Sequence, residues 1–415
     1  MTILNGKRVV LGVTGSIACF KAAQLCSTLV QAGAQVDVIL TDAAQRFITP
    51  LTFQSLTRRP VYTSLYDVLP DYSSAHVELG ARADVLVICP ASATTLARLA
   101  AGLAEDMLSC TALATRAPLV IAPAMNVNMW QHPATQRNVA TLRERGALQV
   151  GPVEGYLAEG ISAMGRLAPL EDVLAAVRVA LGRHGPLAGR RLIVTAGGTR
   201  EPIDPVRYVG NRSSGKMGYA LAEAARDRGA RVTLITGPTA LPAPWGVDVV
   251  PVETASEMEA AVLSACEQAD ALIMAAAVAD YRPEEASSQK LKKTGEPLTL
   301  RLVQNPDIIA EVSRRFGDRL VKVGFAAETC DVLPEAARKL AAKGLHLICA
   351  NDVSEPGSGF GTDTNRVTIL ARDGTREDLP LLPKEEVADR ILDRIQVLLG
   401  AAPPRGTESL VAGAS

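Results

Sequence analysis

Short apolar runs rich in β-branched residues alternate with segments of helical periodicity along most of the chain, and this alternation starts twice. In the first half, the runs 7–13 (KRVVLGV), 35–40 (QVDVIL) and 84–90 (DVLVICP) are separated by segments such as 16–33 that have helical spacing. Strands that alternate with helices in this way form a parallel sheet with helices on both faces. The second half opens with its own run, RLIVTAG at 191–197, and repeats the pattern. The sequence therefore predicts an α/β protein with two doubly wound domains.

A break in the pattern at 181–191 (LGRHGPLAGRR) separates the two series. Three glycines and one proline lie in this segment, and such residues favour a linker. A chain of 415 residues also exceeds the roughly 250 to 300 residues that one hydrophobic core serves. We expect one domain at 1–188, a second at 189–400 and a loose tail at 401–415.

Three helices and one hairpin are expected besides the sheets. Helical spacing predicts helices near 133–145, 255–268 and 384–399. The segment 366–381 (RVTILARDGTREDLPL) carries an Asp-Gly pair between two strand patterns, which indicates a β-hairpin.

Several classes of protein are disfavoured. The chain begins MTILNGKRVV, which lacks the features of a secretory leader, and no apolar run approaches the roughly 20 residues of a membrane helix. The seven cysteines have no C-x-x-C spacing and only four histidines accompany them, so reduced core thiols are expected rather than a zinc site. Lys plus Arg minus Asp plus Glu gives 15 − 13 = +2 for 1–188 and 28 − 31 = −3 for 189–415. We expect a cytoplasmic protein that binds neither nucleic acid nor membranes.

Two loops in the first half follow strands and carry small or hydroxyl side chains. Residues 9–21 give a strand, then G-x-T-G-S, then a helix, and C-P-A-S-A-T-T at 89–95 follows another strand. The first arrangement directs backbone N–H groups and a helix N-terminus at an anion. A tight strand-to-helix turn without a ligand would need the same glycines. Two such loops at strand ends form a crevice.

Five motifs in order carry a more specific resemblance: G-x-T-G-S-I-A, H-V-x-L, P-A-S-A-T, A-A-G-L-A-E-D-M-L and P-A-M-N-x-x-M-W. Across about 5–180 they resemble the flavin-containing cysteine decarboxylases, specifically phosphopantothenoylcysteine decarboxylase, a flavodoxin-like or Rossmann-like flavoprotein fold. The resemblance implies that His76 is the base or proton carrier and that Asn126 holds the substrate carboxylate. The residues that it assigns to FMN binding are Gly15, Ser16, Thr41, Ser92 and Thr95.

The chain departs from this family in one loop. The family's loop carries Ala-Cys-Gly, whose cysteine donates the proton that completes reduction of an enethiol, whereas 155–167 here reads GYLAEGISAMGRL and has Glu159 at the cysteine position. Three interpretations stay open: Glu159 or another acid supplies the proton, the first domain releases the enethiol, or it is a non-catalytic flavoprotein scaffold. His76 and Asn126 argue against a scaffold, which would not need them.

The second half carries a basic, glycine-rich segment at 195–218 (TAGGTREPIDPVRYVGNRSSGKMG). It could be a generic dinucleotide turn, but G-x-G-x-x-G is absent and three arginines and a lysine supply more positive charge than a turn needs. A domain of net negative charge that holds a polyanion concentrates its cations locally.

This segment, with AAAVADYRP, QKLKK, QNPDII, GFAAET and ICANDV further on, resembles the phosphopantothenate–cysteine ligase half of bacterial bifunctional enzymes across about 190–395, a Rossmann-like domain. Such a ligase converts 4'-phosphopantothenate into an acyl-cytidylate with CTP, and the amine of cysteine then attacks. Because phosphate charge develops, the chemistry calls for lysine, Mg²⁺ and amide donors. The resemblance assigns acyl-cytidylate formation to Lys290, a nucleotide or Mg²⁺ contact to Asp280, and the phosphopantothenoyl intermediate to Asn211 and Arg207.

The resemblance places the CTP site at Asp280, Lys290, Asn305, Pro306, Asp307, Ile308, Phe325, Lys339 and Lys343. Lys339 and Lys343 lie four apart and could instead form a solvated helix face. The implied partners are 4'-phosphopantothenate, cysteine and CTP, and the implied assembly is a homo-oligomer, a dodecamer built from decarboxylase trimers and ligase dimers.

Overall fold

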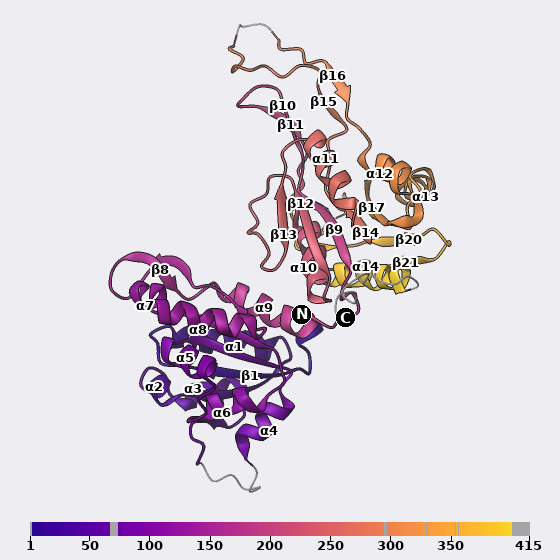
Figure 1. The fold of residues 1–415 in the computed structure, drawn as a ribbon. Coiled ribbons are helices and arrows are strands. Elements are labelled where there is room, and N and C mark those ends of the chain that lie inside the picture. The colour runs from indigo at the N-terminus through magenta and orange to yellow at the C-terminus, as the bar shows by residue number, and fades with distance from the viewer. Residues whose placement is uncertain are drawn as a thin grey trace, which may run out of the picture. The chain divides into compact units, whose positions relative to one another are not determined.

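The chain folds into two compact units, each with its own sheet (Figure 1). The structure is a computed structural model, which describes residues 2–66, 74–293, 297–328, 331–352, 354–355 and 357–400. Unit 1 is Met1–Arg183 and unit 2 is His184–Ser415. The division falls in the glycine-rich segment, and the expected tail at 401–415 lies outside the described residues.

Unit 1 is built on a parallel sheet of six strands in the order β3-β2-β1-β4-β5-β6. The strands are β1 (Arg8–Val13), β2 (Gln35–Leu40), β3 (Val61–Tyr62), β4 (Val85–Ala91), β5 (Leu119–Pro123) and β6 (Leu148–Gln149). This is the Rossmann order, not the flavodoxin order, and the chain reverses direction across the sheet between β1 and β4. All seven residues of β4 are buried, as expected for a parallel strand covered on both faces.

Helices pack on both faces of this sheet. One face contacts α1 (Cys19–Gln31), α3 (Pro50–Thr57) and α9 (Leu170–Gly182). The other face is covered by α4 (Ala75–Arg82), α5 (Ala93–Ala101), α6 (Met107–Ala114) and α8 (Pro133–Glu144). Apolar side chains of these helices share a core with β1, β4 and β5. The short helices α2 (Asp42–Gln45) and α7 (Val127–Gln131) follow β2 and β5.

Unit 2 repeats the same topology and extends it. Its sheet runs β13-β12-β9-β14-β17-β18-β20-β21, with the first six strands parallel and the last two antiparallel. The strands are β9 (Arg191–Ala196), β12 (Arg231–Thr236), β13 (Asp248–Pro251), β14 (Ala271–Met274), β17 (Val321–Glu328), β18 (Leu347–Asp352), β20 (Thr368–Ala371) and β21 (Arg376–Asp378). The expected hairpin at 366–381 is β20–β21, so that prediction is confirmed.

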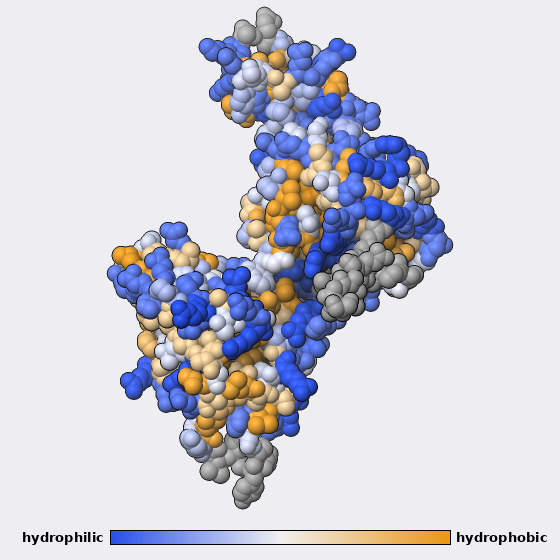
Figure 2. All heavy atoms as spheres, in the orientation of Figure 1, coloured by the Kyte–Doolittle hydropathy of each residue, from blue (hydrophilic) through white to orange (hydrophobic). Residues whose placement is uncertain are grey.

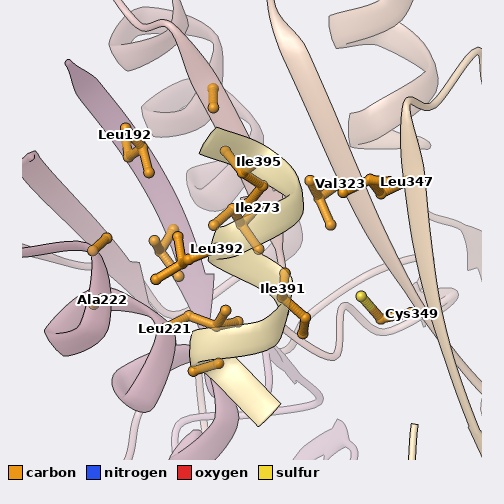
Figure 3. Close-up of a cluster of buried hydrophobic side chains, with 14 of the residues drawn as sticks. Leu192, Leu221, Ala222, Ile273, Val323, Leu347, Cys349, Ile391, Leu392 and Ile395 are labelled. Carbon is orange, nitrogen blue, oxygen red and sulfur yellow. The ribbon is translucent and has the colours of Figure 1, made fainter. Parts of the chain in front are cut away.

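Two hydrophobic cores lie on opposite faces of the unit 2 sheet. In the first, α10 (Lys216–Asp227) and α14 (Lys384–Gly400) bury Leu221, Ile391 and Ile395 against the strands (Figure 3). In the second, α11 (Ala255–Cys266), α12 (Ile308–Phe316) and α13 (Val332–Ala342) pack on the other face. The helices expected near 133–145, 255–268 and 384–399 correspond to α8, α11 and α14.

Small antiparallel pairs project from the sheets and were not predicted. They are β7–β8 (Val153–Tyr156 with Ser162–Arg166), β10–β11 (Arg200–Pro202 with Tyr208–Gly210), β15–β16 (Tyr281–Pro283 with Leu302–Gln304) and β19–β22 (Thr364–Asn365 with Leu382–Pro383). Strands of two to five residues are too short for alternation to reveal them. Among the described helices, none combines the length and apolarity needed to cross a membrane.

Candidate functional site

A pocket of about 460 Å³ lies at the carboxyl ends of β1, β4 and β5 in unit 1. Its walls are the loop segments 15–18, 92–93 and 124–126 together with the β7–β8 hairpin. We call it the unit 1 pocket. Its position, where the strand order reverses, is where open α/β sheets bind ligands, and its volume suits a small molecule.

Thr14 connects two of the loops that form the walls of this pocket. Its hydroxyl donates to the carbonyl oxygen of Pro90 (2.7 Å) and accepts from the backbone N–H of Ser92 (2.9 Å). The Ser92 hydroxyl lies 3.1 Å from that of Thr95. Sequence reasoning missed Thr14, although it is the threonine of G-x-T-G-S and follows β1 directly.

The pocket combines positive charge with apolar surface. Lys21, on the first turn of α1, and Arg166, on β8, line it, as do Ile17, Phe20 and Met129. Burial and the positive charge of Arg166 lower the pKa of Lys21. The loop before α1 adds the positive end of a helix dipole. A flat apolar group that carries an anion fits this combination.

Asn126 and Glu159 meet in the unit 1 pocket. Asn126 caps α7, with its Oδ1 accepting from the backbone N–H of Asn128 (2.8 Å), and its Nδ2 donates to Glu159 Oε1 (3.0 Å). The neighbouring Met125 N–H donates to the carbonyl oxygen of Gly165 on β8 (3.0 Å). The hairpin therefore holds the expected loop acid against the expected carboxylate-binding amide.

Two residues expected to bind FMN, Thr41 and Thr95, and the expected proton carrier His76 lie outside the described lining of this pocket. Thr41 caps α2, with its hydroxyl oxygen accepting from the Ala44 N–H (3.3 Å). Thr95 is buried behind Ser92. His76 is half-buried on the first turn of α4. Gly15, Ser16 and Ser92, by contrast, line the pocket.

Unit 2 has a pocket of about 340 Å³ at the equivalent place, where the strand order reverses between β9 and β14. We call it the unit 2 pocket. The structure places eight of the expected CTP residues in its lining: Asp280, Asn305, Pro306, Asp307, Ile308, Phe325, Lys339 and Lys343.

Hydrogen bonds and ion pairs fix the polar side chains among these. Asn305 donates from Nδ2 to the carbonyl oxygen of Ala279 (2.8 Å), and Asp307 caps α12. Lys343 lies 2.9 Å from an Asp307 oxygen, and Lys339 pairs with Glu328. The two lysines thus face the pocket and carboxylates rather than only solvent.

A glycine-rich strap, residues 357–365, adds a second wall that the sequence analysis did not foresee. Gly359, Phe360 and Asn365 of the strap line the pocket. Lys384, the first residue of α14, is buried and donates to the strap carbonyl oxygens of Gly359 (3.1 Å) and Thr362 (2.6 Å). Lys216 donates to the Gly361 carbonyl oxygen (2.8 Å) and pairs with Asp363 (2.7 Å). Burial and the nearby Lys216 lower the pKa of Lys384, against the opposing effect of Asp363.

Comparison with known proteins addresses both units. The family described as Flavoprotein matches residues 2–182, and the family described as DNA/pantothenate metabolism flavoprotein C-terminal domain matches 187–398. A coenzyme A biosynthesis bifunctional protein CoaBC of Bacillus subtilis (strain 168) is 47% identical over 399 residues, covering 95% of this chain and 98% of that protein. The chain belongs to the family of CoaBC bifunctional proteins. The CoaBC protein of Escherichia coli (strain K12) is 46% identical over 94% of this chain and 97% of its own length. A solved C-terminal domain of a CoaBC protein is 41% identical, covers 52% of this chain and all of its own, and has a TM-score of 0.46.

The remaining three expected residues of unit 2, Arg207, Asn211 and Lys290, lie outside the described lining of the unit 2 pocket. Asn211 donates to the carbonyl oxygen of Ala277, a pocket residue, and accepts from the Ser213 N–H (3.1 Å). Asn211 therefore sits next to the pocket wall.

Asp204 organises a separate cluster from Arg207 and the segment that contains Lys290. The Asp204 carboxylate pairs with the Arg207 guanidinium (Nε to Oδ2, 2.9 Å) and accepts from the Leu291 N–H (3.2 Å). Arg207 in turn donates to the Leu291 carbonyl oxygen (3.0 Å). The hydrogen bond from Arg207 holds the pKa of Asp204 well below its usual range. Lys290 is exposed beside this cluster.

Proposed function

We propose that this chain catalyses two consecutive steps of coenzyme A biosynthesis. It joins cysteine to 4'-phosphopantothenate with CTP, and it decarboxylates the resulting 4'-phosphopantothenoylcysteine to 4'-phosphopantetheine. The observation that carries this proposal is full-length similarity to bifunctional CoaBC proteins, together with one separate pocket in each unit.

The unit 2 pocket is assigned to ligation because it suits a nucleoside triphosphate. Four lysines line it, Lys216, Lys339, Lys343 and Lys384, against the carboxylates of Asp280 and Asp307. Such preorganised cations stabilise the charge that develops when the carboxylate of phosphopantothenate displaces pyrophosphate. Mg²⁺ is commonly held by one or two carboxylates together with substrate phosphates, and we assign that contact to Asp280.

Outside the pocket lining we assign Lys290 to acyl-cytidylate formation and Arg207 and Asn211 to the phosphopantothenoyl intermediate. Asn211 has the geometry for this, since its amide is fixed at both ends beside the pocket wall. Lys290 is exposed next to the Asp204 cluster, so its ammonium group is accessible to a ligand.

The unit 1 pocket is assigned to decarboxylation, with FMN as the cofactor. Gly15, Ser16 and Lys21 offer a site for a phosphate, and Ile17, Phe20 and Met129 offer apolar contacts for a ring. When bound, FMN would supply reversible two-electron oxidation and reduction. Asn126 would hold and orient the substrate carboxylate, and Glu159 would donate a proton. We retain His76 as a proton carrier, as the family resemblance implies.

We also propose a cytoplasmic homo-oligomer of trimers and dimers. Large apolar side chains of unit 1 are exposed, among them Phe47, Leu51 and Leu113, and Figure 2 shows apolar surface around α2, α3 and α6. Exposed apolar patches mark interaction surfaces. Free, buried thiols such as Cys19, Cys26 and Cys89 agree with a reducing compartment.

Mass spectrometry of the products formed from 4'-phosphopantothenate, cysteine and CTP tests this function. Both activities give 4'-phosphopantetheine, with CMP and pyrophosphate. Accumulated phosphopantothenoylcysteine would show that unit 1 is inactive. A product lighter than phosphopantetheine by two hydrogens would show that the reaction stops at the enethiol and that Glu159 does not complete it.

A further inference from the structure

Asn126 presents a fixed hydrogen-bond donor to the unit 1 pocket. The amide oxygen accepts from the Asn128 N–H (2.8 Å), so the orientation of the amide is set and its Nδ2 must point the other way. In the structure this nitrogen already donates to a carboxylate, that of Glu159 (3.0 Å). The Asn126 amide therefore binds a carboxylate of the protein itself in a structure that holds no substrate.

The exposed side chain of Glu159 can form this contact with Asn126 and can also exchange it for solvent. Glu159 lies between β7 and β8 of the hairpin, and Asn126 is a neutral partner. The other charged side chains in the described lining are the cations Lys21 and Arg166. Within the described lining, Glu159 is thus the acidic side chain, and it contacts the amide of Asn126.

A substrate that loses carbon dioxide brings a second carboxylate to the same amide. Two carboxylates that share one site repel each other, and this repulsion is removed when one of them takes up a proton. The substrate carboxylate must stay ionised to lose carbon dioxide, so the proton belongs on Glu159.

We infer that binding of the substrate carboxylate at Asn126 loads Glu159 with a proton from solvent, which Glu159 then donates to the carbon that has lost carbon dioxide. This inference rests on the decarboxylation proposed above.

Before carbon dioxide is lost, the substrate thiol must be oxidised to a thioaldehyde, a two-electron oxidation that FMN would supply. The bond between the carbon and the carboxyl group then breaks, and its electron pair moves toward the C=S group to give the enethiolate. The O–H bond of Glu159 breaks as a C–H bond forms at that carbon, the C=S bond is restored, and Glu159 returns to its ionised form. The two electrons would then return from reduced FMN, which converts the C=S group to the thiol of the product. Departure of carbon dioxide removes the repulsion that held the proton, so loading and release are timed by the substrate itself.

Proton uptake on binding measures the loading step directly. The ligand is 4'-phosphopantothenoyl-alanine, which keeps the carboxylate but has no thiol to oxidise and is not turned over. The reference ligand is 4'-phosphopantothenoyl-ethylamine, which lacks the carboxylate. Titration calorimetry of the full-length flavoprotein at pH 7 in two buffers of different ionisation enthalpy gives the protons taken up per ligand bound.

We expect the protein to take up more protons when it binds the alanine ligand than when it binds the ethylamine ligand. The difference should be up to one proton per unit 1 pocket. Glu159→Gln should abolish this difference, and Glu154→Gln, an exposed glutamate of β7 outside the described pocket lining, should keep it. Binding at the unit 2 pocket is the same in all three proteins and cancels. Equal uptake of the two ligands by the unaltered protein, or an undiminished difference in Glu159→Gln, would overturn the inference, as would its loss in Glu154→Gln.

A separate assay keeps this result distinct from the proposed function. Release of carbon dioxide from 4'-phosphopantothenoylcysteine by the unaltered protein tests decarboxylation alone. If carbon dioxide is released without the uptake difference, the loading of Glu159 is wrong and the function stands. If none is released, the proposed decarboxylation itself is wrong.

Discussion

Asp204 shows how one buried carboxylate can position residues that are far apart in sequence. It holds the guanidinium of Arg207 and the backbone of Leu291 together, and so fixes the backbone next to Lys290. Sequence reasoning named Arg207 and Lys290 but not the residue that joins them. A carboxylate in a Pro-Ile-Asp-Pro turn gives no periodic signal, and its role appears only in three dimensions.

Replacing Lys290 by Gln is expected to slow acyl-cytidylate formation while decarboxylation of supplied phosphopantothenoylcysteine continues. Loss of one or two charge-assisted contacts corresponds to a rate deficit of about ten- to several-hundred-fold. Pyrophosphate release with CTP and phosphopantothenate measures it. Lys292→Gln, an exposed neighbour, is the control, and near-normal ligation by the Lys290 variant would remove this lysine from the reaction.

His346 should make the stability of unit 2 depend on pH. Burial, with the nearby Arg372 and Lys322, lowers its pKa to about 4, and its Nδ1 accepts from the Lys322 N–H (3.1 Å). The unfolded chain protonates this ring near pH 6.5, so the unfolded state binds the proton more readily between these values. The free energy of unfolding should therefore decrease as the pH is lowered from about 6.5 to 4. Between pH 7 and pH 5 the loss should be about 2 kcal/mol.

Urea unfolding of the full chain at pH 7 and pH 5 checks this value. His346→Asn keeps an acceptor near the position of Nδ1 but cannot gain the proton, so it should lose about 2 kcal/mol less than the unaltered chain. His184→Asn, at an exposed site, serves as the control. Identical pH dependence in His346→Asn and the unaltered chain would show that this histidine is not responsible.

At the scale of elements, the β7–β8 hairpin contributes most to the unit 1 pocket and was the least predictable part of it. The sequence analysis treated 155–167 as a loop, as the family resemblance implies. Strands of four and five residues are too short for alternation to reveal them. At Gly165 the hairpin is hydrogen-bonded to Met125, in the loop that follows β5. The φ of Gly165 is +143°, and a Cβ there would lie 2.2 Å from the carbonyl oxygen of Met125.

Gly165→Ala is therefore expected to displace β8 from Met125, and with it the contact between Asn126 and Glu159. Backbone strain of this kind costs about 1 to 3 kcal/mol, so flavin content and decarboxylation should fall while ligation continues. Flavin absorbance per protomer measures the effect. Gly146→Ala, where φ is +91° but a Cβ would meet open space, separates strain from collision. Equal flavin content in both variants would argue against this role of Gly165.

The long strands and helices could be predicted from the sequence, whereas the unit 2 pocket could be predicted only in part. Runs such as 84–90 are buried on both faces, so the apolar pattern alone indicates a parallel strand. Asn305 and Phe325 were indicated by the resemblance of QNPDII and GFAAET to the ligase family, not by the strand pattern. Lys384 and Phe360 were indicated by neither, because the strap reaches the pocket through tertiary packing. The run G-S-G-F-G at 357–361 was the available signal.

At the scale of the molecule, the two pockets belong to different units. The unit 1 pocket uses residues up to Leu167, and unit 1 ends at Arg183. A fragment of residues 1–185 should therefore be yellow with bound FMN and should decarboxylate phosphopantothenoylcysteine, but it should not ligate. Absorbance spectra and product analysis test this, with circular dichroism to verify folding. A folded but colourless fragment would contradict the assignment of the flavin to unit 1.

The place of Lys384 in the unit 2 pocket has a consequence for synthesis of the chain. Because this residue opens α14, the last of the described helices, which also fills the core of unit 2, the unit 2 pocket lacks one wall until residues beyond Lys384 have left the ribosome. Unit 1 is complete more than 200 residues earlier, and domains generally fold in order as they emerge. A nascent chain would thus hold a finished flavin site before it could make the substrate for it.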